Sequence, residues 1–141
     1  MARIKLQPPE KVLFRMEMPV RITDLNYGGH VGNHCFPAYL HEARLAFLKA
    51  LGYSEMDVEG YGLIMADLAL QFRSELFHGE TLIVELGISA WNIMGFELCY
   101  QLKTKADERL VALATTQMVC FDYKERSMKA LPSGVREKLE G

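Results

Sequence analysis

The sequence has no excess of charge of one sign, no long apolar run and few cysteines. Its 141 residues carry a formal net charge of −2, which offers no basic face for nucleic acid. No apolar run reaches membrane-spanning length, and the opening residues MARIKLQPPEK lack an apolar core of signal-peptide length. These absences predict a cytoplasmic protein that binds neither nucleic acid nor a membrane.

Several cofactor and nucleophile motifs are also missing. Cys35, Cys99 and Cys120 are odd in number and lack C-x-x-C spacing, which predicts buried free thiols in a reducing compartment. No set of His, Cys and acidic residues has the spacing of metal ligands. The glycines lack the G-x-G-x-x-G context of a dinucleotide site, and no serine lies in a G-x-S-x-G turn. We therefore expect neither a metal nor a resident cofactor.

The most informative stretch runs from residue 23 to residue 51. Residues 24–34 contain one acid, two asparagines, two histidines and three glycines, and an apolar helix follows directly. A polar loop that enters the N-terminus of a buried helix brings backbone N–H donors, imidazoles and a carboxylate together. Chemistry on a carbonyl needs fixed donors for the developing oxyanion and a base nearby. This segment is therefore the predicted site.

The helix is predicted over residues 37–51. Pro37 suits its first turn, and Gly52 suits the position just past its end. Apolar residues recur at helical spacing on one face: Phe36, Leu40, Ala43, Phe47 and Leu51. The opposite face is expected to carry the charged residues His41, Glu42, Arg44 and Lys49. A helix this apolar predicts a central position, covered by a sheet.

Five alternating segments predict strands, and no other long helix is expected. They cover residues 14–23, 63–72, 82–90, 96–102 and 110–121. Pro19 places the first strand at a sheet edge or a bulge. In the second, Ile64, Ala66 and Leu68 are expected on one face. A short helix opens at Pro132-Ser133. With a polar arm over residues 1–11, the chain reads as a single α+β domain, 1–141, with antiparallel strands.

The loop and helix together resemble a known family. The stretch DLNYGGHVGN at residues 24–33, followed by Glu42-Ala43-Arg44 within the helix, is similar to the hot-dog-fold thioesterases of the 4-hydroxybenzoyl-CoA thioesterase type. The resemblance implies a five-stranded antiparallel sheet wrapped around one long central helix. It also implies an acyl-CoA substrate, with coenzyme A as part of that substrate, and a homodimer or homotetramer whose active sites lie between subunits.

The resemblance assigns catalytic roles to four residues. Asn26 stands where many relatives have an aspartate that serves as nucleophile or base; an asparagine can only orient water or donate a hydrogen bond. His30 matches the G-H-V histidine, and histidine is the side chain best suited in general to exchange protons near neutral pH. The backbone N–H of Asn33 matches the oxyanion donor. Asp24 either supports the chemistry or caps its own turn. The base is therefore expected to be His30 or Asp24.

Further residues are expected to contact the substrate or remain as alternatives. The substrate-contacting candidates are Gly28, Gly29, His34, Phe36 and Tyr39. Glu42 is a further candidate, because another hot-dog branch uses a glutamate of the helix as its base. Two other functions stay open at this point. One is a hot-dog hydratase or dehydratase with Asp24 and His30 as its acid and base. The other is a non-catalytic acyl-thioester-binding subunit, which Asn26 in place of an acid would permit.

Overall fold

The computed structural model describes residues 4–140. Its helices and strands, in chain order, are β1 (Phe14–Pro19), α1 (Phe36–Ala50), β2 (Gly62–Phe72), β3 (Thr81–Trp91), β4 (Gly95–Thr104), β5 (Leu110–Asp122), β6 (Ser127–Met128) and α2 (Ser133–Glu140). Two 3₁₀ turns, Ile22–Asp24 and Asn33–Cys35, flank the polar loop. Neither α-helix within residues 4–140 has the length and hydrophobicity needed to cross a bilayer.

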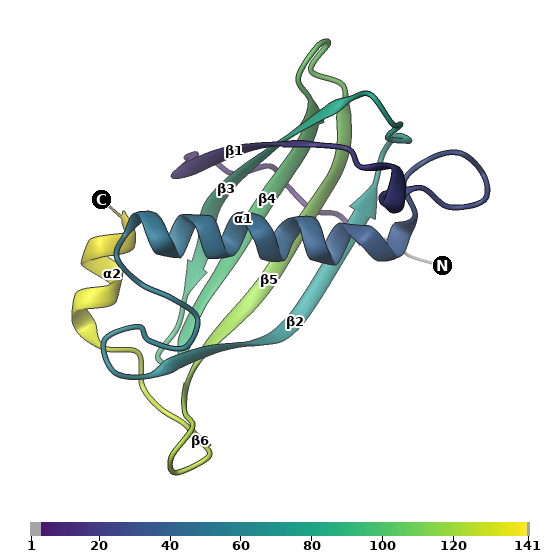
Figure 1. Ribbon diagram of the computed structural model, residues 1–141. Coiled ribbons are helices and arrows are strands. Elements are labelled where there is room, and N and C mark those ends of the chain that lie inside the picture. The colour runs from purple at the N-terminus through teal and green to yellow at the C-terminus, as the bar shows by residue number, and fades with distance from the viewer. Residues whose placement is uncertain (1–3, 141) are drawn as a thin grey trace.

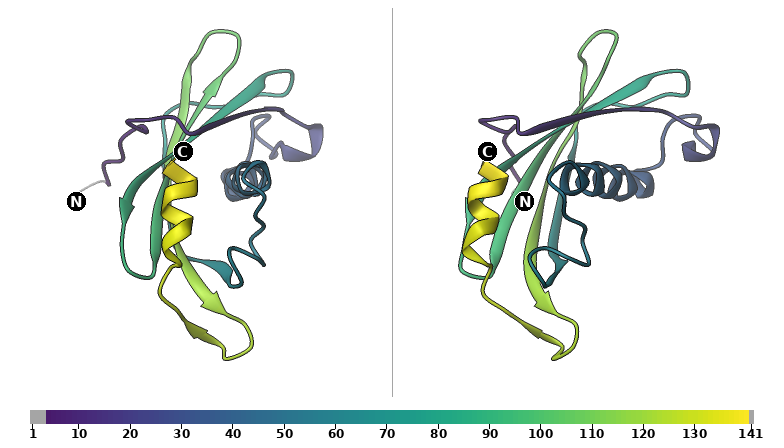
Figure 2. Two further views of the ribbon diagram at one scale, coloured as in Figure 1. Left: turned by 90° about the vertical axis from the view of Figure 1, so that its left-hand side faces the viewer. Right: turned by 60° about the vertical axis from the view of Figure 1, so that its left-hand side comes forward.

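The sheet curls around α1, which lies across its concave face (Figures 1 and 2). The strand order is β1-β3-β4-β5-β2, every pairing is antiparallel, and the short β6 pairs with β5. The five predicted strands and the α+β hot-dog arrangement are confirmed. The two-residue β6 was not predicted, since a segment so short carries no alternation.

The central helix lies within one residue of its predicted bounds. Pro37 falls in its first turn, and Gly52 follows its end with a φ of +82°. Its inner face buries Leu40, Ala43 and Phe47 almost completely. These side chains share one core with fully buried residues of the sheet: Leu82, Val84, Leu86, Tyr100 and Leu102. Burial of this apolar face therefore fixes α1 against the sheet.

Strand β1 is an edge strand, as Pro19 predicted, but it ends sooner than expected. The chain leaves the sheet at Pro19 and forms the 3₁₀ turn Ile22–Asp24. Ile22 lies in this turn and is 66% exposed, so the prediction that the strand continues to residue 23 is wrong. This turn brings Asp24 to α1, where its carboxylate accepts a hydrogen bond from the Tyr39 hydroxyl.

Strand β2 forms the other edge and contains a β-bulge. Met65 pairs with Met118 and Asp67 pairs with Gln117, so Ala66 has no opposite residue. The expected single face through Ile64, Ala66 and Leu68 is therefore wrong, because an extra residue reverses the alternation. On both sides of the bulge, large apolar side chains lie 38–45% exposed along this edge: Met65, Leu68 and Phe72.

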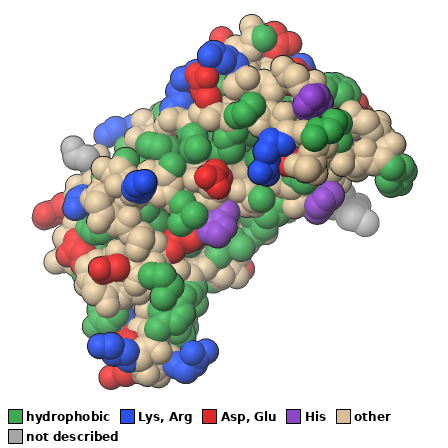
Figure 3. All heavy atoms as spheres, viewed as in Figure 1, with side chains coloured by type: hydrophobic (Ala, Val, Ile, Leu, Met, Phe, Trp, Pro, Cys, Tyr) green, Lys and Arg blue, Asp and Glu red, His purple; other side chains and the backbone are tan. Residues whose placement is uncertain are grey.

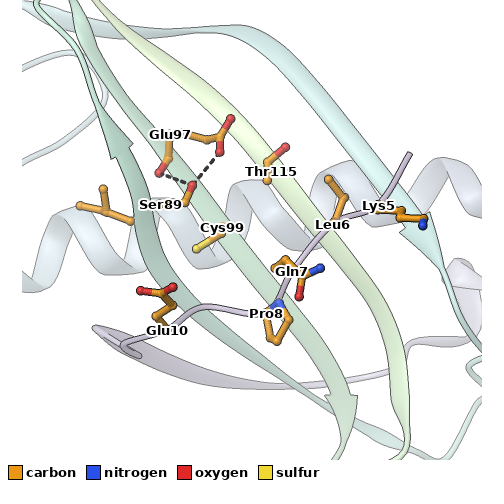
Figure 4. Close-up of a pocket in the computed structure, with 10 residues that line it drawn as sticks. Lys5, Leu6, Gln7, Pro8, Glu10, Ser89, Glu97, Cys99 and Thr115 are labelled. Carbon is orange, nitrogen blue, oxygen red and sulfur yellow. Dashed lines mark hydrogen bonds between the residues drawn. The ribbon is translucent and has the colours of Figure 1, made fainter. Parts of the chain in front are cut away.

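The arm formed by residues 4–11 crosses the sheet on the side opposite α1 (Figure 4). The Leu6 N–H donates to Oε1 of Gln71 at 3.3 Å, and the Gln71 amide donates to the carbonyl of Ile4 at 3.1 Å. A Cβ at Gly87 would lie 2.5 Å from the carbonyl oxygen of Lys11, so this glycine permits the crossing. The rest of the predicted arm, residues 1–3, lies outside the described residues.

Candidate active site

The polar loop is a tight turn closed by its own hydrogen bonds. The Asn26 N–H donates to the His30 carbonyl at 2.9 Å, and the Gly28 N–H donates to Asn26 Oδ1 at 2.8 Å. Gly29 adopts a φ of +83°, which favours glycine, and a Cβ at Gly28 would lie 3.2 Å from Asn26 Oδ1. Both glycines therefore shape the loop, and Asn26 uses its side-chain oxygen to hold it.

Asp24 is the centre of what we call the Asp24 cluster, made with Arg21 and Tyr39. The carboxylate is 3% exposed and accepts three hydrogen bonds: from the Arg21 N–H at 3.0 Å, Arg21 Nη2 at 3.2 Å and the Tyr39 hydroxyl at 2.9 Å. Burial acts to raise the pKa of Asp24, but these bonds outweigh it and hold the pKa below its usual value. Such a buried, bonded carboxylate is better suited to positioning the loop than to accepting a proton.

The first turn of α1 joins this cluster to the sheet. The Phe36 ring packs edge to face against Tyr39 at 5.6 Å and against Phe72 at 5.1 Å. Cys35 lies beside Asp24 and donates its thiol to the Asp24 carbonyl at 3.4 Å. Burial and the charge of Asp24 raise the pKa of this thiol, so it remains protonated and is unsuited to act as a nucleophile.

His30 and Asn33 line one groove of about 250 Å³, with Phe36 beside them. The opposite wall is formed by residues 72–76, the end of β2 and the segment after it, which lie about forty positions further along the chain. The Val31 N–H donates to the Leu76 carbonyl at 2.8 Å and fixes the two walls to each other. The groove therefore combines two predicted catalytic residues with Arg73 and Glu75, which sequence reasoning missed.

The orientation of His30 fixes the roles of its two ring nitrogens. Nδ1 lies 3.1 Å from the carbonyl oxygen of Val31. A carbonyl only accepts, so in the neutral ring Nδ1 carries the proton and Nε2 has the free lone pair. Nε2 faces Gly28, where a Cβ would lie 3.5 Å from it. This arrangement leaves the basic nitrogen of His30 available to a proton donor.

The start of α1 supplies hydrogen-bond donors to the same groove. In the turn that precedes it, the Cys35 N–H donates to Gly32 at 2.9 Å, and the Phe36 N–H donates to the carbonyl of Asn33. The Asn33 N–H has no acceptor within residues 4–140. The 15-residue helix behind it adds the positive end of its dipole. The Asn33 N–H is thus placed to receive a negative oxygen.

Other predicted residues lie apart from this groove. Glu42 lines a separate groove of about 310 Å³ between β1 and α1, which Tyr39 also borders. The His34 ring packs over Gly32, where a Cβ would lie 2.5 Å from its Cε1 atom. The groove beneath the arm, about 330 Å³, lies on the far face of the sheet. Within that groove the Ser89 hydroxyl donates a hydrogen bond to Oε1 of Glu97 at 2.6 Å.

A second polar network, which we call the Arg44 cluster, crosses the middle of α1. It contains Arg44, Glu55, His41, Tyr100 and Thr116. Arg44 is 6% exposed; its Nε donates to Glu55 at 2.9 Å and its Nη1 to the Tyr100 hydroxyl at 3.3 Å. The expectation that Arg44 lies on an outer, charged helix face is wrong. A carboxylate from the following connector neutralises it, which helical spacing cannot reveal.

A sheet curled around one long helix, with an imidazole and a free N–H at the start of that helix, is the architecture of a hot-dog thioester hydrolase. The chain belongs to the Thioesterase-like superfamily, whose family model matches residues 20–139. It is 26% identical over 126 residues to the acyl-acyl carrier protein thioesterase ATL3 of Arabidopsis thaliana. That match covers 88% of this chain and 66% of the plant protein.

Solved structures share the same fold. The 1,4-dihydroxy-2-naphthoyl-CoA thioesterase Slr0204 from Synechocystis superposes with a TM-score of 0.80 at 25% identity. The match covers 89% of this chain and 94% of that one. The DHNA-CoA thioesterase from Staphylococcus aureus, 17% identical, gives a TM-score of 0.79 over 89% of this chain and 87% of its own. The latter likeness concerns the fold alone.

Proposed function

We propose that the protein is an acyl-CoA thioesterase that releases a carboxylic acid and free coenzyme A. Coenzyme A enters as part of the substrate, and the proposal requires no other cofactor. The observation that carries it is the groove at the start of α1, which is lined by both His30, whose Nε2 has no hydrogen-bond partner within residues 4–140, and Asn33, whose N–H is unpaired there. A base and an oxyanion donor are the two groups that thioester hydrolysis needs.

In the proposed reaction, His30 acts twice. Nε2 takes a proton from water as the water oxygen bonds to the thioester carbonyl carbon. The resulting oxyanion accepts the Asn33 N–H at the positive end of α1. When the C–S bond breaks, the imidazolium returns its proton to the leaving sulfur, which departs as the coenzyme A thiol.

Asn26 and Asp24 position these groups. The side-chain oxygen of Asn26 already accepts the Gly28 N–H, and the carboxylate of Asp24 is bonded to Arg21 and Tyr39. Neither group needs to ionise or titrate during hydrolysis. The loop therefore works with an asparagine where many relatives have an acid, because the base is supplied by the imidazole.

The test is thiol release from a series of acyl-CoA chain lengths by the wild-type protein. We expect His30→Gln to lower kcat by about 10²–10⁴-fold, the usual loss for a general base. His78→Gln is the matched control, because His78 is exposed in the turn between β2 and β3 and lines none of the grooves above. No thiol release by the wild type on any chain length rejects the function. Full activity in His30→Gln rejects His30 as the general base.

We also propose that two copies associate through β2, as a homodimer or as a tetramer of dimers. β2 is an 11-residue edge strand with unpaired backbone groups on its outer side, and Met65, Leu68 and Phe72 lie exposed along it. Figure 3 shows hydrophobic side chains gathered on the face that carries α1. Light scattering is expected to give a multiple of 16.0 kDa, and Leu68→Lys to shift it toward the monomer. A wild-type monomer at micromolar concentration contradicts the proposal.

We propose a cytoplasmic location on the chemistry of the thiols. Cys35, Cys99 and Cys120 are all free in the structure, and the latter two are buried. Unpaired thiols of this kind persist in reducing compartments. Fractionation with an antibody against the protein tests this, and recovery from an oxidising compartment contradicts it.

A further inference from the structure

The groove beside His30 contains an arginine whose charge is not neutralised. The described chain has seven arginines, and Arg15, Arg21, Arg44, Arg109 and Arg136 each pair with a carboxylate within 3.5 Å. Arg73 and Arg126 have no such partner within residues 4–140. Arg126 lies in the turn between β5 and β6, far along the chain from any loop residue. Arg73 lines the groove of His30 and Asn33.

The backbone holds Arg73 firmly at this place. The N–H groups of Arg73 and Ser74 both donate to the Val111 carbonyl, at 2.8 and 3.2 Å, and the Ser74 hydroxyl donates to Leu110 at 2.7 Å. The Val31–Leu76 bond ties the same segment to the loop. The backbone of Arg73 is therefore a fixed part of the groove wall, and its exposed side chain starts from that fixed point.

Charge in the groove comes from few groups. Arg73 is the only permanently charged cation that lines it, and Glu75 is its only carboxylate. The two do not form an ion pair, although they are only two residues apart. The Glu75 backbone carbonyl accepts Arg109 Nη2 at 2.9 Å, which fixes its backbone in turn. A guanidinium remains charged at any physiological pH and offers several donors in one plane, which suits carboxylate and phosphate groups.

We propose that Arg73 is a specificity-determining residue that binds an anionic group of the thioester substrate. The inference rests on the proposed function. Two parts of a substrate can supply the anion: the phosphates of coenzyme A, or a carboxylate on the acyl group. Both present oxygens that a guanidinium binds in the same way. A contact to a substrate group that does not itself react contributes to binding substrate and transition state alike, so its loss raises KM more than it lowers kcat.

The experiment compares Arg73→Gln with Arg126→Gln, the same change at the other unpaired arginine. Three substrates separate the sources: butyryl-CoA, succinyl-CoA and butyryl-N-acetylcysteamine, which lacks the phosphates. Loss of one charged hydrogen-bond contact corresponds to about a tenfold or larger rise in KM. If the phosphates are bound, we expect that rise with both CoA esters and none with the truncated ester. If a carboxylate is bound, only succinyl-CoA is affected. In both cases Arg126→Gln behaves as the wild type.

Two results overturn the inference. One is an unchanged KM for all three substrates in Arg73→Gln. The other is an equal loss with the truncated neutral ester, which indicates a structural role. Calorimetric binding of free coenzyme A and of succinate by the wild type and by Arg73→Gln provides a readout without turnover. If the wild type hydrolyses acyl-CoA and Arg73→Gln behaves identically, only the proposed role of Arg73 is rejected. If the wild type has no thioesterase activity, the proposed function is rejected. The difference in calorimetric binding between the wild type and Arg73→Gln then tests anion binding by Arg73 on its own.

Discussion

The two polar clusters around α1 differ in whether the hydrogen-bonding groups in and beside them are all paired. In the Arg44 cluster, Tyr100 and Thr116 are fully buried and bond to each other at 2.7 Å, while Glu55 neutralises the guanidinium. The Asp24 cluster is also bonded within itself, but the turns beside it leave the Asn33 N–H and the Nε2 of His30 unused. Closed networks stabilise a fold, whereas groups left open within a rigid frame are free for chemistry. The comparison predicts that substitutions in one cluster change stability and those near the other change catalysis.

The largest stability effect is expected from Arg44→Met. The change removes the guanidinium and leaves Glu55 and the Tyr100 hydroxyl without it, and breaking a buried ion pair costs about 3 kcal/mol. We expect that loss in the free energy of unfolding, measured in urea, with kcat of the folded protein unchanged. A variant with wild-type stability and impaired kcat would contradict the assignment of the Arg44 cluster to stability.

Asp24→Asn is expected to have the next largest effect. It removes the charge that three hydrogen bonds stabilise, and bonds to charged groups contribute about 1.5–3 kcal/mol. The pKa of Asp24 is lowered by folding, so its contribution is complete above the ordinary value of 3.8 and disappears as the pH falls below that value. Urea titrations at pH 7 and below pH 3.8 test this.

The stability gap between the wild type and Asp24→Asn should be present at pH 7 and shrink in acid. A gap that stays constant across this range contradicts the assignment of a lowered pKa. Activity at pH 7 should also fall in Asp24→Asn, but by less than in His30→Gln, because the variant displaces the loop without removing the base.

Tyr39→Phe is expected to cost about 1.5 kcal/mol, the lower end of the range for a hydrogen bond to a charged group. The ring remains, so its packing against Phe36 is retained. Tyr53→Phe is a matched control, because Tyr53 bonds Glu59 at the far end of α1. Thermal unfolding and kcat are measured for both. A fall in kcat confined to Tyr39→Phe indicates that the Asp24 cluster positions the loop, and equal effects in both variants contradict this.

The smallest effect is expected from Asn26→Asp. A carboxylate oxygen can accept the Gly28 N–H as the amide does at present, so the turn keeps its shape. We expect thioesterase activity to be preserved or raised, measured as kcat over the acyl-CoA series. A marked loss would indicate that the amide N–H₂ of Asn26 itself contacts the substrate, with Asn26→Ser as the comparison.

Local spacing was enough to predict the helix, the five strands and the loop that enters the helix. The 3.6-residue recurrence of Leu40, Ala43 and Phe47 reports burial directly, because the sheet covers that face. The loop residues His30 and Asn33 could be proposed as site residues because their types and their place before a helix follow one short motif. These are features that depend on neighbours in the sequence.

What the sequence did not reveal depends on residues that are distant in the chain. Arg44 is buried only because Glu55 and Tyr100 reach it, and the opposite wall of the groove joins the loop through the Val31–Leu76 bond. The bulge at Ala66 reverses an alternation that looked regular. In each case the tertiary contact overrides the local pattern.

The arm across the outer face of the sheet has a consequence for the order of folding. Residues 4–11 bind Gln71 on β2 and pass over Gly87 on β3, positions that leave the ribosome much later. Between those two strands lie β4 and β5, so the surface that receives the arm exists only once all four are paired. Contacts so distant in sequence form slowly, because the long loop must close first. We therefore expect the segment that is synthesised early to be among the last to dock, after β2, which leads into the second wall of the groove at the start of α1, has joined the sheet.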